Sequence, residues 1–306
     1  MSWYKYGYYV ILAFLMSACV TQTVDYHRIA DNGSFPADIS IASDDLPDKD
    51  GNLTILSLNI AHGRNQSINQ LLVNKEDLKH NIITIARLIK AVDADVVALQ
   101  EVDGPSSWSG NFDHLELLAR EAKYPWYYRA NHAESRLFNY GTAILSRLPV
   151  QEIMQYTFDP SPPTFNKGFL LATVNWARDS ENGEDVTIDI ASVHLDFSRQ
   201  SVREKQITEL STALKDRKNP LILAGDFNSD WFAEESAVRR LAEDTRMSAF
   251  RPKTRDLPTY KSDRRYDWIL ITNELAYVSY QVLPDPVSDH RAIVAEIMMI
   301  APSVQK

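Results

Sequence analysis

The chain has 306 residues, enough for one large domain or two small ones with a well-buried core. Hydrophobic residues make up 44% and charged residues 24%, which is close to the globular average and excludes a disordered or fibrous chain. The net charge of −9 argues against bulk attraction of polyanions, although it leaves room for a local basic groove. With one cysteine, the chain can form no internal disulfide and no metal site built on cysteine pairs.

The first residues have the pattern of an export signal. Lys5 precedes an apolar run over residues 8–16, which is too short to cross a bilayer but typical of a signal peptide. The segment LMSAC, which ends at Cys19, resembles the lipobox of bacterial lipoproteins. The resemblance implies removal of residues 1–18 as a signal peptide and attachment of lipid to Cys19. An ordinary signal peptide or an uncleaved anchor is the alternative.

Two further features bear on where the chain resides. Val20 follows the cysteine in place of the aspartate that favours retention in the inner membrane, so we expect a membrane-anchored lipoprotein of the bacterial outer membrane. Residues 19–50 are rich in aspartate and lack a sustained apolar period, which predicts a lipidated tether that buries no face.

Regular secondary structure is expected from Leu53 onward. Short apolar runs predict strands, and apolar residues at helical spacing predict helices. In chain order we expect a strand at 53–58, a helix at 75–92, a strand at 95–99, a helix at 115–122, strands at 126–129, 142–145, 153–158, 169–176 and 186–195, a helix at 203–214, a strand at 221–224, a helix at 234–242, and strands at 268–272, 276–283 and 291–297. Two packed mixed sheets with helices outside would cover every apolar face, so we expect one α/β domain over 51–306.

Polar side chains interrupt or end six of the predicted strands. They are Asn59, Glu101, His194, Asp226 with Asn228, Asp267, and Asp289 with His290. Singly, each is more often a turn former or a hydrogen-bonded structural residue. Together they combine oxygen ligands suited to Mg²⁺, two imidazoles, and carboxylates that can orient those imidazoles. We therefore expect them to converge on one rim of the sheets.

The same segments resemble, in order, the motifs of the endonuclease/exonuclease/phosphatase superfamily of metal-dependent phosphoesterases. The matching segments are LNI at 58–60, LQE at 99–101, YGTAILSR at 140–147, VHL at 193–195, GDFN at 225–228, YDWI at 266–269 and SDH at 288–290. The match covers about residues 52–298 and implies a four-layer α/β sandwich, in agreement with the two packed sheets expected above.

The resemblance implies a metal site. Glu101 matches the main Mg²⁺ ligand, Asn59 lies beside it, and Asp289 is expected near the same or a second metal position, with Mn²⁺ as a substitute ion. Mg²⁺ takes few protein oxygens and keeps several waters, so this small set of ligands can suffice.

The resemblance also implies the catalytic groups. Asp226 matches the residue that orients or deprotonates the attacking water, and Asn228 the one that fixes phosphate or water. His290 matches the imidazole that meets the scissile phosphate, with Asp267 as its orienting carboxylate, and the pKa of such a histidine should be raised. His194 matches a second imidazole on the phosphate or leaving-group side.

These expectations describe a divalent-metal-dependent phosphodiesterase of the nuclease type that uses in-line attack by water. The alternative is a phosphomonoesterase or sphingomyelinase-like enzyme that acts on small organophosphates or phospholipid headgroups. A non-catalytic binding lipoprotein is a third reading, which the presence of every matched polar residue disfavours. The partners expected are the phosphoester substrate and, through the N-terminal lipid, a membrane; no protein partner is evident.

The choice of substrate depends on weaker signals. The loop at 103–111 contains no Lys or Arg, although nucleases often place cations there, and this argues against a polynucleotide. Trp108 in this loop is a candidate for contact with a base or an acyl chain, and Arg199 is a candidate phosphate contact. The alternatives are that Trp108 covers local core and that Arg199 is solvated.

Overall fold

The computed structural model describes residues 51–300 except 68, 71–72, 136 and 178–184. The predicted signal peptide, the tether and Cys19 lie outside these residues, so they stay predictions. Within the described part of the chain, no helix combines the length and apolarity needed to cross a membrane.

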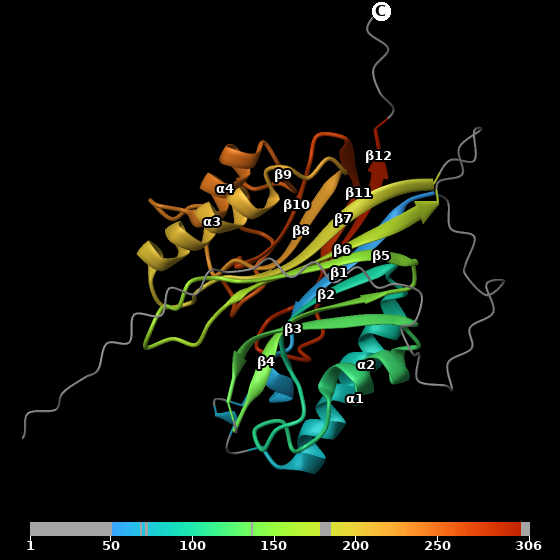
Figure 1. Ribbon diagram of the computed structural model, residues 1–306, viewed down its shortest axis with the longest axis vertical. Helices are drawn as coiled ribbons and strands as arrows, with labels where there is room; N and C mark the ends of the chain where they lie inside the picture. The colour runs from blue at the N-terminus through green and yellow to red at the C-terminus, as the bar shows by residue number, and fades with distance from the viewer. Residues whose placement is uncertain (1–50, 68, 71–72, 136, 178–184, 301–306) are drawn as a thin grey trace, which may run out of the picture.

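Two six-stranded mixed sheets form the centre of the fold (Figure 1). The first has the spatial order β11 (Leu275–Val282), β12 (Ile293–Met299), β1 (Leu53–Asn59), β2 (Val96–Asp103), β4 (Asn139–Ser146) and β3 (Trp126–Glu134). The second has the order β5 (Val150–Thr157), β6 (Gly168–Ala177), β7 (Asp185–His194), β8 (Leu221–Asp226), β10 (Asp267–Ile271) and β9 (Ser248–Ala249).

Four helices complete the layers. The helices α1 (Lys75–Val92) and α2 (His114–Ala122) pack on the first sheet, and α3 (Gln200–Leu214) and α4 (Ala237–Thr245) pack on the second (Figure 1). The order of layers is therefore helix, sheet, sheet, helix, which confirms the predicted four-layer α/β sandwich.

The apolar runs of the sequence explain this layering. Along β1, Leu53 and Ile55 face the core between the sheets, whereas Leu56 and Leu58 face the helices. Side chains alternate between the two faces of a strand, so a strand covered on both faces is apolar throughout. The predicted helix at 75–92 also forms, because its apolar residues recur on one face and Asn74 caps its first turn through the amide of Asp77.

Most of the predicted elements are confirmed, with differences at their ends. β2 continues beyond Glu101 to Asp103 through a bulge, and β3 extends to Glu134. The last strand was expected from residue 291 but begins at Ile293, so Asp289 and His290 lie ahead of it. The short strand β9 and the 3₁₀ turn η2 (Ala61–Gly63) were not predicted.

Candidate active site

Strand register places the polar residues of the second sheet side by side. His194 ends β7 and pairs with Asp226, which ends the parallel strand β8. Asp226 pairs in turn with Asp267, the first residue of the antiparallel strand β10. All three side chains are almost fully buried. They therefore lie in a row on one rim of this sheet.

Close packing of β7 and β8 explains the glycine before Asp226. A Cβ at Gly225 would lie 2.0 Å from the carbonyl oxygen of Val193, so only glycine fits there. Beyond the strand, the amide of Asn228 donates to Asp226 Oδ1 at 2.9 Å, and its side chain donates to the carbonyl of Leu195 at 3.0 Å. Asn228 thus fixes the carboxylate of Asp226.

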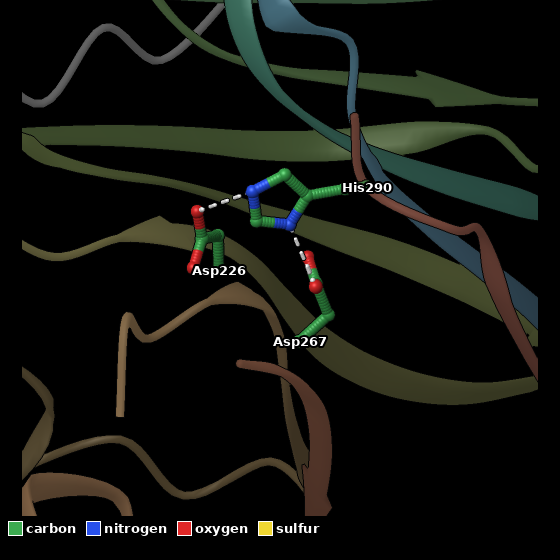
Figure 2. Close-up of side chains that lie close together, drawn as sticks. All are labelled: Asp226, Asp267 and His290. Atoms are coloured by element: carbon green, nitrogen blue, oxygen red, sulfur yellow. Dashed lines mark hydrogen bonds and ion pairs between the residues drawn. The ribbon is translucent and has the colours of Figure 1, made fainter. Parts of the chain in front are cut away.

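The imidazole of His290 lies between two carboxylates (Figure 2). Its Nδ1 donates to Asp267 Oδ2 at 2.8 Å, and its Nε2 is 3.7 Å from Asp226 Oδ2. Burial by itself lowers the pKa of His290, but the carboxylates of Asp267 and Asp226 outweigh it and raise the pKa to about 10. The upward shift agrees with the raised histidine pKa expected from the sequence, and it favours the imidazolium form of His290 at neutral pH.

The pKa of Asp226 is shifted mainly by burial. Burial raises its pKa, the neighbouring His290 lowers it, and the overall shift is upward. Its Oδ2 accepts a hydrogen bond of 3.0 Å from Asn59 Nδ2, which comes from the end of β1 in the other sheet. This bond joins the two sheets at the rim and brings the predicted metal side of the site against the predicted water-activating side.

Glu101 reaches the rim through a strained backbone. It occupies the bulge in β2 opposite Thr142 and Gly141 and has a φ of 55°. A left-handed conformation is costly for a residue with a side chain, and bulges often redirect a side chain at functional sites. The bulge is the reason why Glu101 projects at the rim although the strand continues past it.

Four basic side chains surround the Glu101 carboxylate within the described residues. His62 Nε2 is 3.3 Å and Arg64 Nη1 3.5 Å from Oε2, and Lys167 Nζ and His194 Nε2 are each 3.9 Å from Oε1. Burial raises the pKa of Glu101, but His62, Lys167, His194 and Arg64 together hold it well below its usual value. These neighbours therefore favour the ionised form of Glu101 at neutral pH.

His194 differs from His290 in its charge. Burial lowers its pKa well below the usual value, and the ammonium of Lys167, 3.4 Å from Nδ1, lowers it further. Its Nε2 lies 3.6 Å from Asp226 Oδ2. The site thus pairs one charged imidazole, His290, with one neutral imidazole, His194.

The residues predicted to hold Mg²⁺ fit a divalent cation. Arg64 bridges Glu101 at 3.5 Å and Asp289 at 2.6 Å, so both carboxylates already face one position that a positive group fills. Asn59 adds an amide oxygen, which accepts the amide of Ala61 at 2.9 Å. Carboxylate and amide oxygens are the ligands that hard cations prefer. Asp226, Asp267 and His290 form a second group whose ligand atoms lie within 4.8 Å of one another.

The two predicted substrate contacts lie in different settings. Trp108 is half-buried, and its ring meets Phe138 and His62 edge-on at centroid distances of 6.2 and 6.0 Å. Arg199 directs its guanidinium to the carbonyl of Ser161. Trp108 therefore borders the site, and Arg199 holds a neighbouring loop; contact of either with substrate stays a prediction.

The sequence had given no role to the pair His62 and Asp103, which the structure brings to the site. His62 Nδ1 is hydrogen-bonded to Asp103 Oδ1 at 2.7 Å, and both side chains are buried. Each lies close behind a predicted metal ligand, His62 after Asn59 and Asp103 after Glu101. A histidine and an aspartate near the ends of two adjacent parallel strands were the signal that could have paired them.

The sequence of the chain matches the model of a known protein family. The model of the endonuclease/exonuclease/phosphatase family matches residues 56–290. The chain belongs to this family. Members of the endonuclease/exonuclease/phosphatase family are hydrolases that act on phosphoesters and depend on a divalent metal. No curated protein matches the chain in sequence.

Solved structures of the endonuclease/exonuclease/phosphatase family share the fold. A family protein from Leptotrichia buccalis has 20% sequence identity and a TM-score of 0.60 over 81% of this chain and 100% of its own. The Bacteroides thetaiotaomicron mannosyl-6-phosphatase has 15% identity and a TM-score of 0.57 over 81% of this chain and 100% of its own. Staphylococcus aureus beta toxin with bound magnesium ions has 15% identity and a TM-score of 0.57 over 80% of this chain and 99% of its own.

The raised pKa of His290 predicts a pH dependence of stability. Its folded-state pKa of about 10 exceeds the ordinary value of 6.5, so the folded protein binds this proton more tightly than the unfolded chain. The stabilisation is complete below about pH 6.5 and disappears as the pH rises through about 10. The melting temperature, measured in EDTA, should therefore fall as the pH rises through this range, and Asp267→Asn should make this fall smaller. The exposed carboxylate variant Asp263→Asn is the control, and equal slopes for both variants would contradict the pairing.

Proposed function

We propose that the protein is a divalent-metal-dependent phosphodiesterase that cleaves a P–O bond by in-line attack of water. The observation that best supports this is the convergence of two chemical sets on one rim. The ionised Glu101, with Asn59 and Asp289, supplies oxygen ligands. The His290–Asp267 pair and Asp226 supply a cation and a proton acceptor a few ångströms away.

Asp226 is the group that accepts the proton of the attacking water. Its Oδ1 is held by the Asn228 amide and its Oδ2 by Asn59, so the carboxylate has one orientation. A positioned base of this kind must be ionised, and burial raises its pKa, so activity should fall as the solution becomes acidic.

His290 is the group that meets the phosphoryl oxygen as negative charge builds. Asp267 keeps Nδ1 engaged, which leaves Nε2 and the positive charge of the ring for the substrate. A preorganised cation in a water-poor site stabilises the transition state more than it would in water. The metal, when bound by Glu101, Asn59 and Asp289, supplies charge neutralisation to the phosphate and the leaving oxygen.

A specific observation favours a second candidate, hydrolysis of a phosphomonoester or a phospholipid headgroup. Lys167, which is buried, and Arg64 both lie within 4.0 Å of the Glu101 carboxylate, so two cations are concentrated at the proposed metal site. The adjacent loop at 103–111 has no cation to hold flanking phosphates. Cations concentrated at one point suit a terminal, doubly charged phosphate better than a long polyanion.

A panel of substrates tests these alternatives. Plasmid DNA, bis-p-nitrophenyl phosphate, p-nitrophenyl phosphate and sphingomyelin micelles would be assayed with Mg²⁺, with Mn²⁺ and with EDTA. We expect diester hydrolysis that EDTA abolishes and Mg²⁺ restores. Faster turnover of p-nitrophenyl phosphate or sphingomyelin would favour the second candidate. A folded protein with no turnover on any substrate would instead support a binding function.

We also propose that the protein is a lipoprotein of the outer membrane. The support is the segment that ends at Cys19, the single cysteine of the chain, followed by Val20. Cys19→Ser should release the protein from the membrane fraction and change its electrophoretic mobility, because the variant lacks the sulfur that carries lipid. Unchanged fractionation and mobility would rule this proposal out.

A further inference from the structure

A second histidine–aspartate pair lies on the opposite side of Glu101 from His194. His62 Nδ1 donates to Asp103 Oδ1 at 2.7 Å, and Asp103 is 1% exposed. The other ring nitrogen of His62, Nε2, lies 3.3 Å from Glu101 Oε2. This is the shortest of the four contacts between a basic side chain and the Glu101 carboxylate among the described residues. Neither His62 nor Asp103 has a role in the proposed hydrolysis.

Packing leaves the ring of His62 little freedom. Tyr140 meets it edge-on with centroids 4.6 Å apart at 85°, and Trp108 meets it at 6.0 Å and 72°. With Nδ1 held by Asp103 and two aromatic rings packed against the imidazole, the ring is held with Nε2 directed toward Glu101. A carboxylate that orients an imidazole, which then orients another group, is a recurrent arrangement around metal ligands.

The backbone is strained at both ends of this contact. Ala61 and His62 have φ values of 48° and 55°, and Glu101 has a φ of 55°. Such conformations are unfavourable in residues with side chains and persist where the surroundings enforce them. The η2 turn, which follows β1, and the bulge in the adjacent parallel strand β2 therefore direct the side chains of His62 and Glu101 toward each other.

We propose that His62, held by Asp103, is a positioning residue that fixes the Glu101 carboxylate for the divalent metal. The contact at Oε2 sets the rotamer of Glu101 and thereby the direction of Oε1. This inference rests on the proposed metal site at Glu101, Asn59 and Asp289. It adds a residue that acts through Glu101 and does not itself bind the ion.

Metal binding by the full chain tests the proposal without any substrate. Mn²⁺ affinity would be measured by electron paramagnetic resonance for the wild type and for His62→Ala, His62→Asn and His62→Gln. The loss of an outer-shell partner typically lowers metal affinity by about 10–100-fold, and we expect this for His62→Ala.

The two amide variants separate positioning from a structural role. The amide nitrogen of glutamine corresponds to Nε2 and can reach Glu101, whereas that of asparagine corresponds to Nδ1 and can reach only Asp103. We expect His62→Gln to keep affinity within a few-fold of wild type and His62→Asn to lose it like His62→Ala. Rescue by asparagine but not glutamine would mean that the pair only ties the loop at Asp103, and would overturn the proposal.

Further measurements and control variants separate the possible causes of a lost affinity. Melting curves show whether each variant folds, and His80→Ala on the exposed face of α1 is the control for loss of an imidazole. Wild-type Mn²⁺ affinity in every folded His62 variant would overturn the positioning role, as would nitrogen coupling from His62 to the bound Mn²⁺, which would make it a direct ligand. Unchanged affinity in Glu101→Gln would instead remove the proposed metal site itself.

Discussion

Glu101→Gln should abolish Mg²⁺-dependent turnover and leave the fold intact. The substitution keeps the shape of the side chain and removes one of the few negative charges that can attract the ion. It leaves His62, Arg64 and Lys167 within 4.0 Å of a neutral amide, so their positive charges would repel a cation from the position. Turnover should fall to the level measured in EDTA, and a titration with Mg²⁺ should not restore it.

The loss must be separated from a loss of folding. Glu121→Gln, on the exposed face of α2, removes the same charge away from the rim and should keep full activity. A change in stability for Glu101→Gln should stay within about 3 kcal/mol, the usual range for one substitution. Should Glu101→Gln keep its Mg²⁺ dependence while Asp267→Asn loses it, the ion sits among Asp226, Asp267 and His290 instead.

Removal of either group on the water-activating side should lower turnover by about 10²–10⁴-fold. Asp226→Asn leaves an amide that cannot accept a proton from water. His290→Ala removes the imidazolium that Asp267 and Asp226 maintain, with the pKa of the ring raised to about 10. Turnover would be normalised to folded protein, with a melting curve for each variant.

Asp267→Asn should cost less turnover than His290→Ala, because the imidazole can still occupy its place without its orienting carboxylate. If Asp267 acts only through His290, the double variant should be little worse than His290→Ala alone. Arg265, two residues before Asp267, is engaged elsewhere: its guanidinium lies 3.9 Å from the centre of the Trp268 ring and donates to the carbonyl of Phe250. Lost stability with intact turnover per folded molecule would refute the catalytic role of this pair.

The layers of the fold follow from the sequence alone. The apolar run at 53–58 and the helical spacing over 75–92 each determine which side chains are buried, because periodicity within a segment fixes the direction of every side chain. β1 and α1 form where these patterns predicted them. The polar residues at the strand ends were also visible, since they interrupt apolar runs in an order that matches one family.

The tertiary structure alone decides how those residues meet. Asn59 and Asp226 are 167 positions apart in different sheets. His62, in the turn after β1, and Asp103, at the end of the adjacent strand β2, are 41 positions apart. No local period relates such residues, because their contact depends on how two sheets pack and on strand register. The bulge that directs Glu101 to the rim arises from the pairing of β2 with β4. There β2 has one residue more than β4, and Glu101 is the residue left without a partner in the register. The sequence therefore determined which groups the site contains, and packing between distant segments decided which of them act together.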